Sequence, residues 1–147
     1  EQAVNQGDRD SLYSNAINPI KKDPTGGIVI FGQKTTQRIP TALDRVNVRR
    51  LMIFVRKTLL ALGKPFQFEP NDEFTWERVQ EAISPFLSDL IARRAIVEGA
   101  VRCDSTTNTP LRVDRNELWC SVSIKPTKVA ETIVFEVNLT SQSATIN

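Results

Sequence analysis

The side chains that could carry chemistry in this chain are acids, lysines, arginines, one tyrosine and two thiols, because its 147 residues include no histidine. Without an imidazole, Ser-His-Asp triads and Cys-His nucleophile pairs are excluded, and so are most zinc sites. Catalysis would have to depend on paired carboxylates, on lysine, on Tyr13, or on Cys103 and Cys120. The sequence therefore leaves few classes of enzyme open.

Acidic side chains gather around the predicted start of a helix, where two of them could form a catalytic pair. The members are Glu69, Asp72, Glu73 and Glu77. Nothing beside them indicates a substrate cleft, and negative charge at a helix N-terminus is favourable for the macrodipole. Further along, Asp104, Asn108 and Asp114 flank a loop whose spacing differs from that of an EF-hand. We therefore predict no enzyme, no metal and no cofactor.

The segment GIVIFGQKTT (27–36) resembles a phosphate-binding P-loop in its two glycines and its lysine. That motif needs a glycine directly before the lysine, whereas Gln33 separates Gly32 from Lys34. The residues between the glycines are β-branched or aromatic, which is typical of a strand. The prediction is a buried core strand over Ile28–Gly32 and no phosphate site.

Basic residues in VRRLMIFVRK (48–57) could form a face for an acidic partner, although the net charge of the chain is only +2. The interleaved aromatic residues typical of single-strand binders are missing. A solvated helix face or a protein contact explains Arg49, Arg50 and Arg56, and a monomeric binding module that uses them remains the alternative. We expect no nucleic acid and no membrane as partner, since no apolar run reaches the roughly 18 residues of a membrane helix.

Two amphipathic helices are predicted in the middle of the chain. The first covers 42–63, ends at Gly63, and carries an apolar stripe of Val48, Leu51, Met52, Val55, Leu59 and Leu62. The second runs from Asp72 to Arg94, with a stripe of Val79, Ile83, Phe86, Leu87 and Leu90. Pro85 lies inside it and predicts a kink or a fresh start capped by Ser84.

Three strands with a period of two are predicted at 95–104, 118–125 and 132–140. Their inward residues are Val97, Gly99, Val101 and Cys103, then Leu118, Cys120, Val122 and Ile124, then Ile133, Phe135, Val137 and Leu139. Both cysteines face the core, so two reduced thiols are expected, with a bridge between adjacent strands as the alternative. Trp119 and Val134 lie on the opposite face, either as packing neighbours or as a patch for another chain.

The predicted fold is α+β: a two-layer sandwich in which a small, mostly antiparallel sheet is covered on one face by two amphipathic helices. We expect residues 1–27 to be a linker or arm, residues 28–140 to be the domain, and residues 141–147 to be a C-terminal tail. Because the chain opens on a polar segment without Met, we expect a processed chain or a piece of a longer protein.

The chain resembles the C-terminal domain of contractile tail sheath proteins of tailed bacteriophages. The segments that carry the resemblance are INPI (17–20), GGIVIFGQKT (26–35), ALDRVNVRRL (42–51), FEPND (68–72) with Trp76 just after, GAVRCDSTTNTP (99–110), VDRNEL (113–118) and IKPTKVAETI (124–133). Sheaths of R-type bacteriocins and of other contractile injection systems share this domain. Outer domains that family members carry before this region are absent here.

The resemblance implies a structural subunit that polymerises helically around an inner tail tube and contracts to drive the tube through the host envelope. The implied partners are further copies of the subunit, the inner tail tube protein, and the baseplate and tail terminator proteins. The implied location is the virion, with assembly in the bacterial host cytoplasm. This domain would form the inner layer of the sheath.

A long apolar strand at a sheet edge promotes aggregation unless something covers it, and only SQSATIN follows the last predicted strand. The resemblance implies that neighbouring subunits pair strands across this edge. The implied inter-subunit strand is Thr132, Ile133, Val134, Phe135, Glu136, Val137, Asn138 and Leu139. The resemblance also places the helix Asp72–Arg94 against the tube, with Glu77, Arg78, Glu81, Asp89, Arg93 and Arg94 as contacts.

Overall fold

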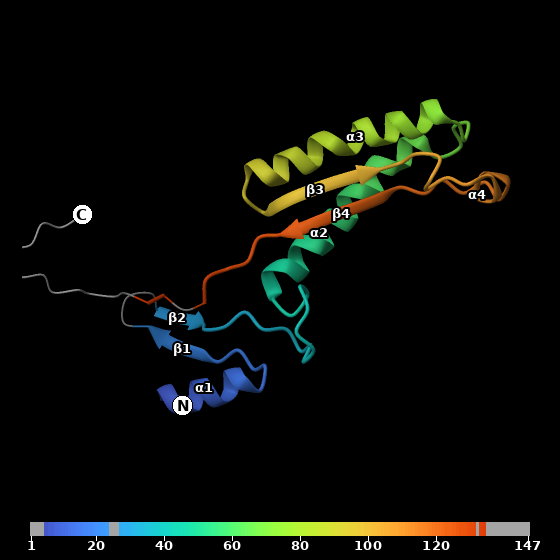
Figure 1. Cartoon of the computed structure of the whole chain (residues 1–147). Helices are drawn as coiled ribbons and strands as arrows, with labels where there is room; N and C mark the ends of the chain where they lie inside the picture. The colour runs from blue at the N-terminus through green and yellow to red at the C-terminus, as the bar shows by residue number, and fades with distance from the viewer. Residues whose placement is uncertain (1–4, 24–26, 132, 135–147) are drawn as a thin grey trace, which may run out of the picture.

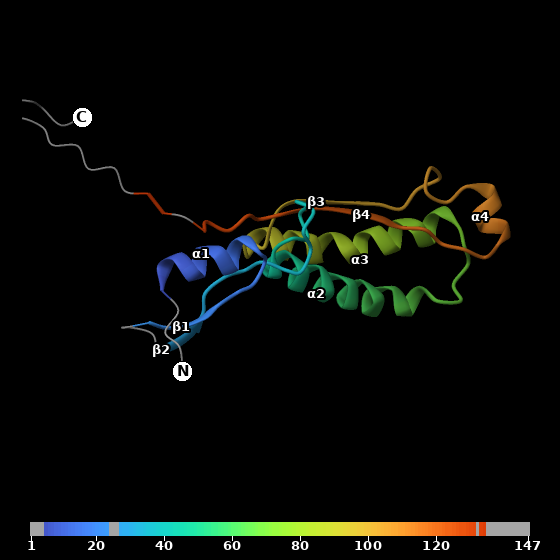
Figure 2. The same ribbon diagram turned by 90° about the horizontal axis from the view of Figure 1, so that it is seen from below.

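The centre of the fold is a two-stranded antiparallel sheet that two long helices cover on one side (Figures 1 and 2). The computed structural model describes residues 5–23, 27–131 and 133–134. In it, β3 (Ile96–Arg102) pairs with β4 (Ser121–Pro126), while α2 (Val46–Gly63) and α3 (Glu73–Ala92) lie beneath them. The predicted α+β class and its one-sided cover of helices are confirmed.

Helix α3 supplies most of the core. Its buried residues are Thr75, Trp76, Val79, Ile83, Leu87 and Leu90. Asp72 caps its start by accepting a hydrogen bond from the Thr75 amide at 2.9 Å. The helix continues through Pro85, so the predicted fresh start at Ser84 is wrong; burial of Ile83 and Leu87 on either side of the proline offsets the missing amide donor.

Helix α2 is only partly covered. Val48 and Val55 are buried, and Leu51, Leu59 and Leu62 pack against the core. Met52, predicted on the same stripe, is partly exposed. The helix ends at Gly63 as predicted, and the short 3₁₀ turn η1 (Lys64–Phe66) follows it.

The inward and outward faces of the sheet agree with the sequence pattern except at one residue. Along β4, Val122 and Ile124 face the helices, while Ser121 and Ser123 are exposed. A register shift between Ile96 and Glu98 in β3 turns Ile96 into the core and leaves Val97 57% exposed. The prediction that Val97 faces inward is therefore wrong, because a β-bulge interrupts the period of two.

The N-terminal region has more structure than the predicted linker. Helix α1 (Gln6–Ser14) is capped by Asn5, which accepts from the Asp8 amide at 2.8 Å. β1 (Ile20–Asp23) and β2 (Gly27–Ile30) form a second sheet beside the main body (Figure 1). The predicted strand at Ile28–Gly32 exists over its first part, but its predicted burial is wrong: Ile28 is 75% exposed in the two-stranded β1–β2 sheet that the described residues form.

A buried amide side chain joins the two ends of the loop between β3 and β4. Asn108 is buried; its Oδ1 accepts from the Trp119 amide at 2.6 Å, and its Nδ2 donates to the Asp104 carbonyl at 3.2 Å. The short helix α4 (Pro110–Asp114) follows it. The polar residues of this loop therefore have a structural role in joining the two strands.

Gly99 lies where β3 packs closely on Leu87 of α3. A Cβ at this position would lie 3.0 Å from Ile96 Cδ1 and 3.5 Å from two atoms of Leu87. Replacement of Gly99 by valine is expected to lower the free energy of unfolding by about 1–3 kcal/mol, because the core must shift to admit the extra atoms. Urea unfolding of the domain measures this change. Ala100→Val, on the exposed side of the same strand, is the control; equal losses for both variants would contradict the packing argument.

Candidate functional site

The outer edge of β4 is the first candidate site. Within the residues that the structure describes, β4 pairs with β3 on one side and with no strand on the other. An open edge presents unpaired amide and carbonyl groups that can pair with another chain. The main-chain groups of β4 are thus positioned for strand addition.

An apolar groove runs beside this edge, between β4 and α2. Val122 and Ile124 form its β4 side, and residues of α2, together with Leu43 shortly before the helix, form the opposite side. The residues that line this opposite side of the groove are Leu43, Arg49, Met52, Ile53, Val55, Arg56, Leu59 and Leu60. Leu60 is 64% exposed, and Ile53 is also exposed. Helix α2 therefore offers apolar surface where a third strand of the sheet would lie.

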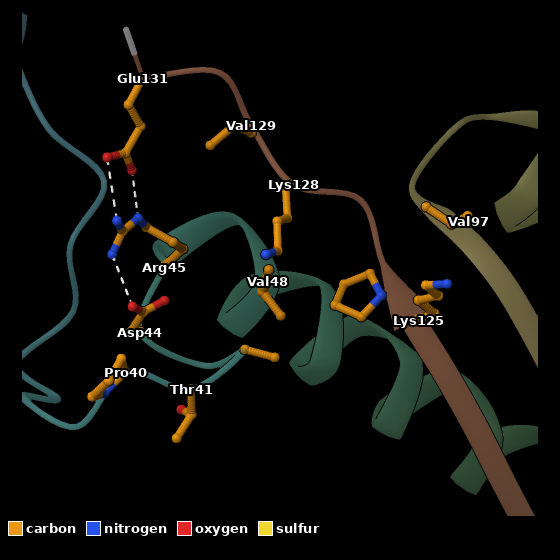
Figure 3. A pocket seen from close by; sticks show the side chains of 12 residues that line it. Pro40, Thr41, Asp44, Arg45, Val48, Val97, Lys125, Lys128, Val129 and Glu131 are labelled. Carbon is orange, nitrogen blue, oxygen red and sulfur yellow. Dashed lines mark hydrogen bonds and ion pairs between the residues drawn. The ribbon is translucent and has the colours of Figure 1, made fainter.

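A second hollow, of about 930 Å³, lies where the chain leaves β4 (Figure 3). Val48, Val97 and Val129 contribute apolar surface, and charged side chains stand around it. Two of these, Arg45 and Glu131, join the start of α2 to the segment that follows β4. This hollow therefore borders the start of the segment that follows β4.

Glu131 is held by two side chains from distant parts of the chain. Arg45 donates through Nε to Oε1 and through Nη2 to Oε2, the latter at 3.2 Å. The Tyr13 hydroxyl donates to the same Oε2 at 2.8 Å. Arg45 also pairs with Asp44 at 3.0 Å. We call Tyr13, Arg45 and Glu131 the clasp; it connects α1, the start of α2 and the C-terminal segment.

The electrostatics of the clasp favour an ionised carboxylate. Burial opposes ionisation of Glu131, but hydrogen bonds from Tyr13 and Arg45 outweigh it and hold the pKa of Glu131 below its ordinary value. The pKa of Tyr13 is raised by burial and by its hydrogen bond to Glu131. At neutral pH the clasp therefore joins a neutral phenol, a guanidinium and a carboxylate.

The two cysteines are free and unsuited to catalysis. Cys103 is buried, and burial raises its pKa; burial and the neighbouring Cys103 raise the pKa of Cys120 to about 11. Thiols with raised pKa values are poor nucleophiles at neutral pH. The prediction of two reduced thiols is confirmed.

The predicted tube contacts are all exposed on α3 or just beyond its end. Glu77 and Glu81 are four residues apart, and so are Asp89 and Arg93, so the members of each pair are neighbours on the helix surface. Arg93 is paired with Asp89 at 2.9 Å, and Arg78 with Glu69 at 2.6 Å. The surface is thus polar and accessible, and its contact with a tube stays a prediction.

The predicted inter-subunit strand is described at only two positions. Ile133 and Val134 are 72% and 83% exposed and lie outside any strand of the single chain. Thr132 and residues 135–139 lie outside the described residues. Pairing of this strand with another chain therefore stays a prediction, and so does the assignment of Val134 to a patch.

Sequence reasoning missed both the groove and the clasp. The clasp residues are far apart in sequence, and no motif relates them. In the parts of the chain that the structure describes, no group of three or more acids or cysteines is arranged to hold a metal ion. Nor does any helix in those parts have the length and apolar character to cross a membrane.

The fold is thus an α+β domain in which, among the described residues, the edge of β4 is unpaired and an apolar groove lies beside it. Residues 40–140 match the phage tail sheath C-terminal domain family, and the chain belongs to this family. It is 35% identical over 136 residues to the tail sheath protein of Vibrio phage KVP40 and 34% identical over 139 residues to that of Enterobacteria phage T4. These alignments cover 92% and 95% of this chain but only 20% and 21% of the relatives, so it spans about a fifth of their length.

Solved structures of contractile systems have the same fold. The chain is similar to the contracted sheath complex of the extracellular contractile injection system PVC, with a TM-score of 0.85 and 25% identity over 94% of this chain. It is also similar to the contracted helical sheath of the anti-feeding prophage, with a TM-score of 0.83 and 25% identity. Both matches cover 41% of the longer chain.

The geometry of the clasp predicts the titration of Glu131. In the native domain its carboxyl is expected to titrate below the ordinary glutamate value of about 4.3, and Arg45→Met is expected to raise the midpoint by removing the main charge partner. NMR observation of the side-chain carboxyl carbon against pH measures both midpoints. Because the folded pKa is lowered, the clasp contributes its stabilisation above the ordinary pKa and loses it as the pH falls through the lowered value. An unchanged midpoint in Arg45→Met would contradict the assigned partner.

Proposed function

We propose that this chain is the polymerising inner domain of a contractile tail sheath subunit. The observation that carries the proposal is the open edge of β4 beside an apolar groove, in a chain that belongs to the sheath family. Copies of the full-length protein would assemble helically around an inner tail tube and contract to drive the tube through the host envelope. The role is structural and needs no catalytic group or cofactor.

The joint between subunits is strand addition at β4. Residues 132–139 of a second copy pair with the open edge, in continuation of the β3–β4 sheet. The alternation of this segment places Ile133, Phe135, Val137 and Leu139 on one face. With that face over the groove, the incoming side chains cover Met52 and Leu60 of α2.

The physics of this joint suits a sheath. Main-chain ladder bonds and buried apolar area come from one continuous strand, so the connection survives rearrangement of the surrounding charges. The predicted tube contacts are exposed charged residues whose ion pairs are individually weak and screened by salt. A weak contact to the tube and a strong contact between subunits fit a sheath that must slide on one partner and stay joined to the other.

The remaining partners follow from the same assignment. The baseplate and tail terminator would contact the ends of the polymer, and the mature location would be the virion after assembly in the host cytoplasm. The alternative, a monomeric module that binds an acidic partner through Arg49, Arg50 and Arg56, is not favoured by family membership. Arg49 and Arg56 border the apolar groove, where their stems can cover an added strand.

Replacement of Leu60 by aspartate tests the groove in a full-length sheath protein that carries this domain. The variant is expected to abolish tube formation, because its carboxylate would be desolvated without a partner under the added strand. Folding of the subunit is expected to persist, since Leu60 is already exposed. Negative-stain electron microscopy of concentrated protein measures tube formation.

The matched control is Leu111→Asp, which places the same change on α4 at a side chain that is 62% exposed. This variant is expected to form tubes. Tubes formed by Leu60→Asp at the wild-type concentration would contradict the groove as the joint.

A further inference from the structure

Phe68 occupies a position in a tight turn where glycine is the usual residue. The turn follows η1 and is closed by a hydrogen bond from the Glu69 amide to the Phe66 carbonyl at 3.3 Å. Gln67 has φ −67° and ψ 127°, and Phe68 has φ 74°, which are the values of a type II turn. The second of these positions needs a positive φ, so any residue with a β-carbon is strained there.

The side chain of Phe68 gains no cover in the single chain that would offset this strain. It is 96% exposed, the largest exposed fraction of any large apolar side chain among the described residues. An aromatic ring in water also loses the stabilisation that burial would give it. A strained backbone and a fully exposed ring at the same residue indicate that Phe68 acts outside the single chain.

Neighbouring side chains hold this turn in place. Arg78 of α3 pairs with Glu69 at 2.6 Å, and its guanidinium lies 5.4 Å from the centre of the Phe66 ring and 5.7 Å from that of Phe74. A ring that projects from a fixed turn loses little entropy when it binds, as is typical of aromatic anchors at protein interfaces. We call Phe68 on this turn the knob.

The hollow of about 930 Å³ lies at the opposite end of the two long helices from the knob. The knob follows the end of α2, whereas the hollow is formed by the start of α2, the start of β3 and the end of β4 (Figures 1 and 2). Val48, Val97 and Val129 line it, and the β-bulge leaves Val97 57% exposed there. Pockets of about 300–1,000 Å³ hold small ligands, so this hollow has room for an aromatic ring.

The charges beside the knob and the hollow are complementary. Asp72 and Glu73 follow the turn and are exposed. At the hollow, the carboxylates are paired with Arg45, but Lys125 and Lys128 form no ion pair in the part of the chain that the structure describes (Figure 3). An acidic knob and a hollow with unpaired lysines favour contact between two copies of this chain.

We propose that the knob of one copy enters the hollow of a second copy, with Glu73 facing Lys128 at the rim. The two surfaces differ and lie at opposite ends of the domain, so the contact repeats from copy to copy and builds an open polymer. Burial of the ring in the partner offsets the strain at Phe68. The contact uses other residues than the strand joint at β4, and it rests on the proposed sheath function, which brings the copies together.

Phe68→Gly in a full-length sheath protein that carries this domain separates a contact from a structural role. Because glycine adopts the positive φ without strain, the thermal midpoint of subunits kept below their assembly concentration is expected to be unchanged or up to about 4 °C higher. The same variant is expected to need at least about tenfold more protein to form tubes. Calorimetry measures the midpoint, and negative-stain electron microscopy of a dilution series without tube protein measures assembly.

Two further variants serve as controls for the loss of an apolar side chain. Leu111→Ala removes an exposed apolar side chain on α4 and is expected to form tubes at the wild-type concentration. Phe68→Leu keeps apolar volume in the hollow and is expected to lose less assembly than Phe68→Gly. A lowered thermal midpoint in Phe68→Gly would show that the ring stabilises its own domain, and would overturn the proposal.

Charge reversal identifies the receiving surface. Glu73→Lys and Lys128→Glu are each expected to raise the concentration needed for tubes severalfold, and the double variant is expected to recover most of the loss, because it restores an opposite-charge pair. Glu81→Lys, an equal change further along α3, is the matched control and is expected to match the wild type. Single variants that match the wild type, or a double variant that recovers nothing, would contradict the hollow as the receiving surface.

The outcomes separate the knob from the strand joint. Tubes formed by Phe68→Gly at the wild-type concentration would overturn the knob and leave the joint standing, since Leu60→Asp tests the joint. Normal tubes of Phe68→Gly that no longer assemble on an inner tail tube would assign the ring to the tube and overturn contact between copies. If the wild type forms no tubes, the proposed function and the knob fail together.

Discussion

The rest of this structure depends on one constraint: the two-stranded sheet is too narrow to cover both long helices. Helix α3 is covered by β3 and supplies the buried core, whereas α2 reaches beyond β4 with apolar side chains partly exposed. A pair of strands is marginal without further cover. The single chain therefore carries exposed apolar surface on α2, which the proposed strand at the edge of β4 would cover.

The exposed apolar surface beside β4 gives the domain a means of strong interaction that needs no catalytic group. Cys103 is buried and Cys120 half-buried, with the pKa values of both raised, and the ion pairs that Arg78 and Asp89 of α3 form are exposed and weak. The strong interaction that remains available is main-chain pairing backed by the groove. In the proposed sheath, a connection of this kind would join subunits firmly.

The helices and the faces of the strands could be predicted because burial imposes a periodic pattern on a local stretch of sequence. The stripes of α2 and α3 and the alternation of β4 follow from that pattern. The exposure of Val97 could not be predicted, because a β-bulge changes which side chains of the strand face inward and leaves no signal in the sequence. The exposure of Ile28 was missed because an apolar strand indicates cover but not which chain supplies it. The contacts of Tyr13, Arg45 and Glu131 depend on tertiary structure that brings distant segments together, and local pattern says nothing about them.

The most direct test of the central claim is a cryo-electron microscopy map of tubes formed by a full-length sheath protein that carries this domain. The account predicts a third strand along the outer edge of β4, traceable to residues 132–139 of a second copy, with Ile133 and Phe135 over the α2 groove. An edge of β4 that stays bare, or one that is occupied by the same chain's own segment, would contradict it.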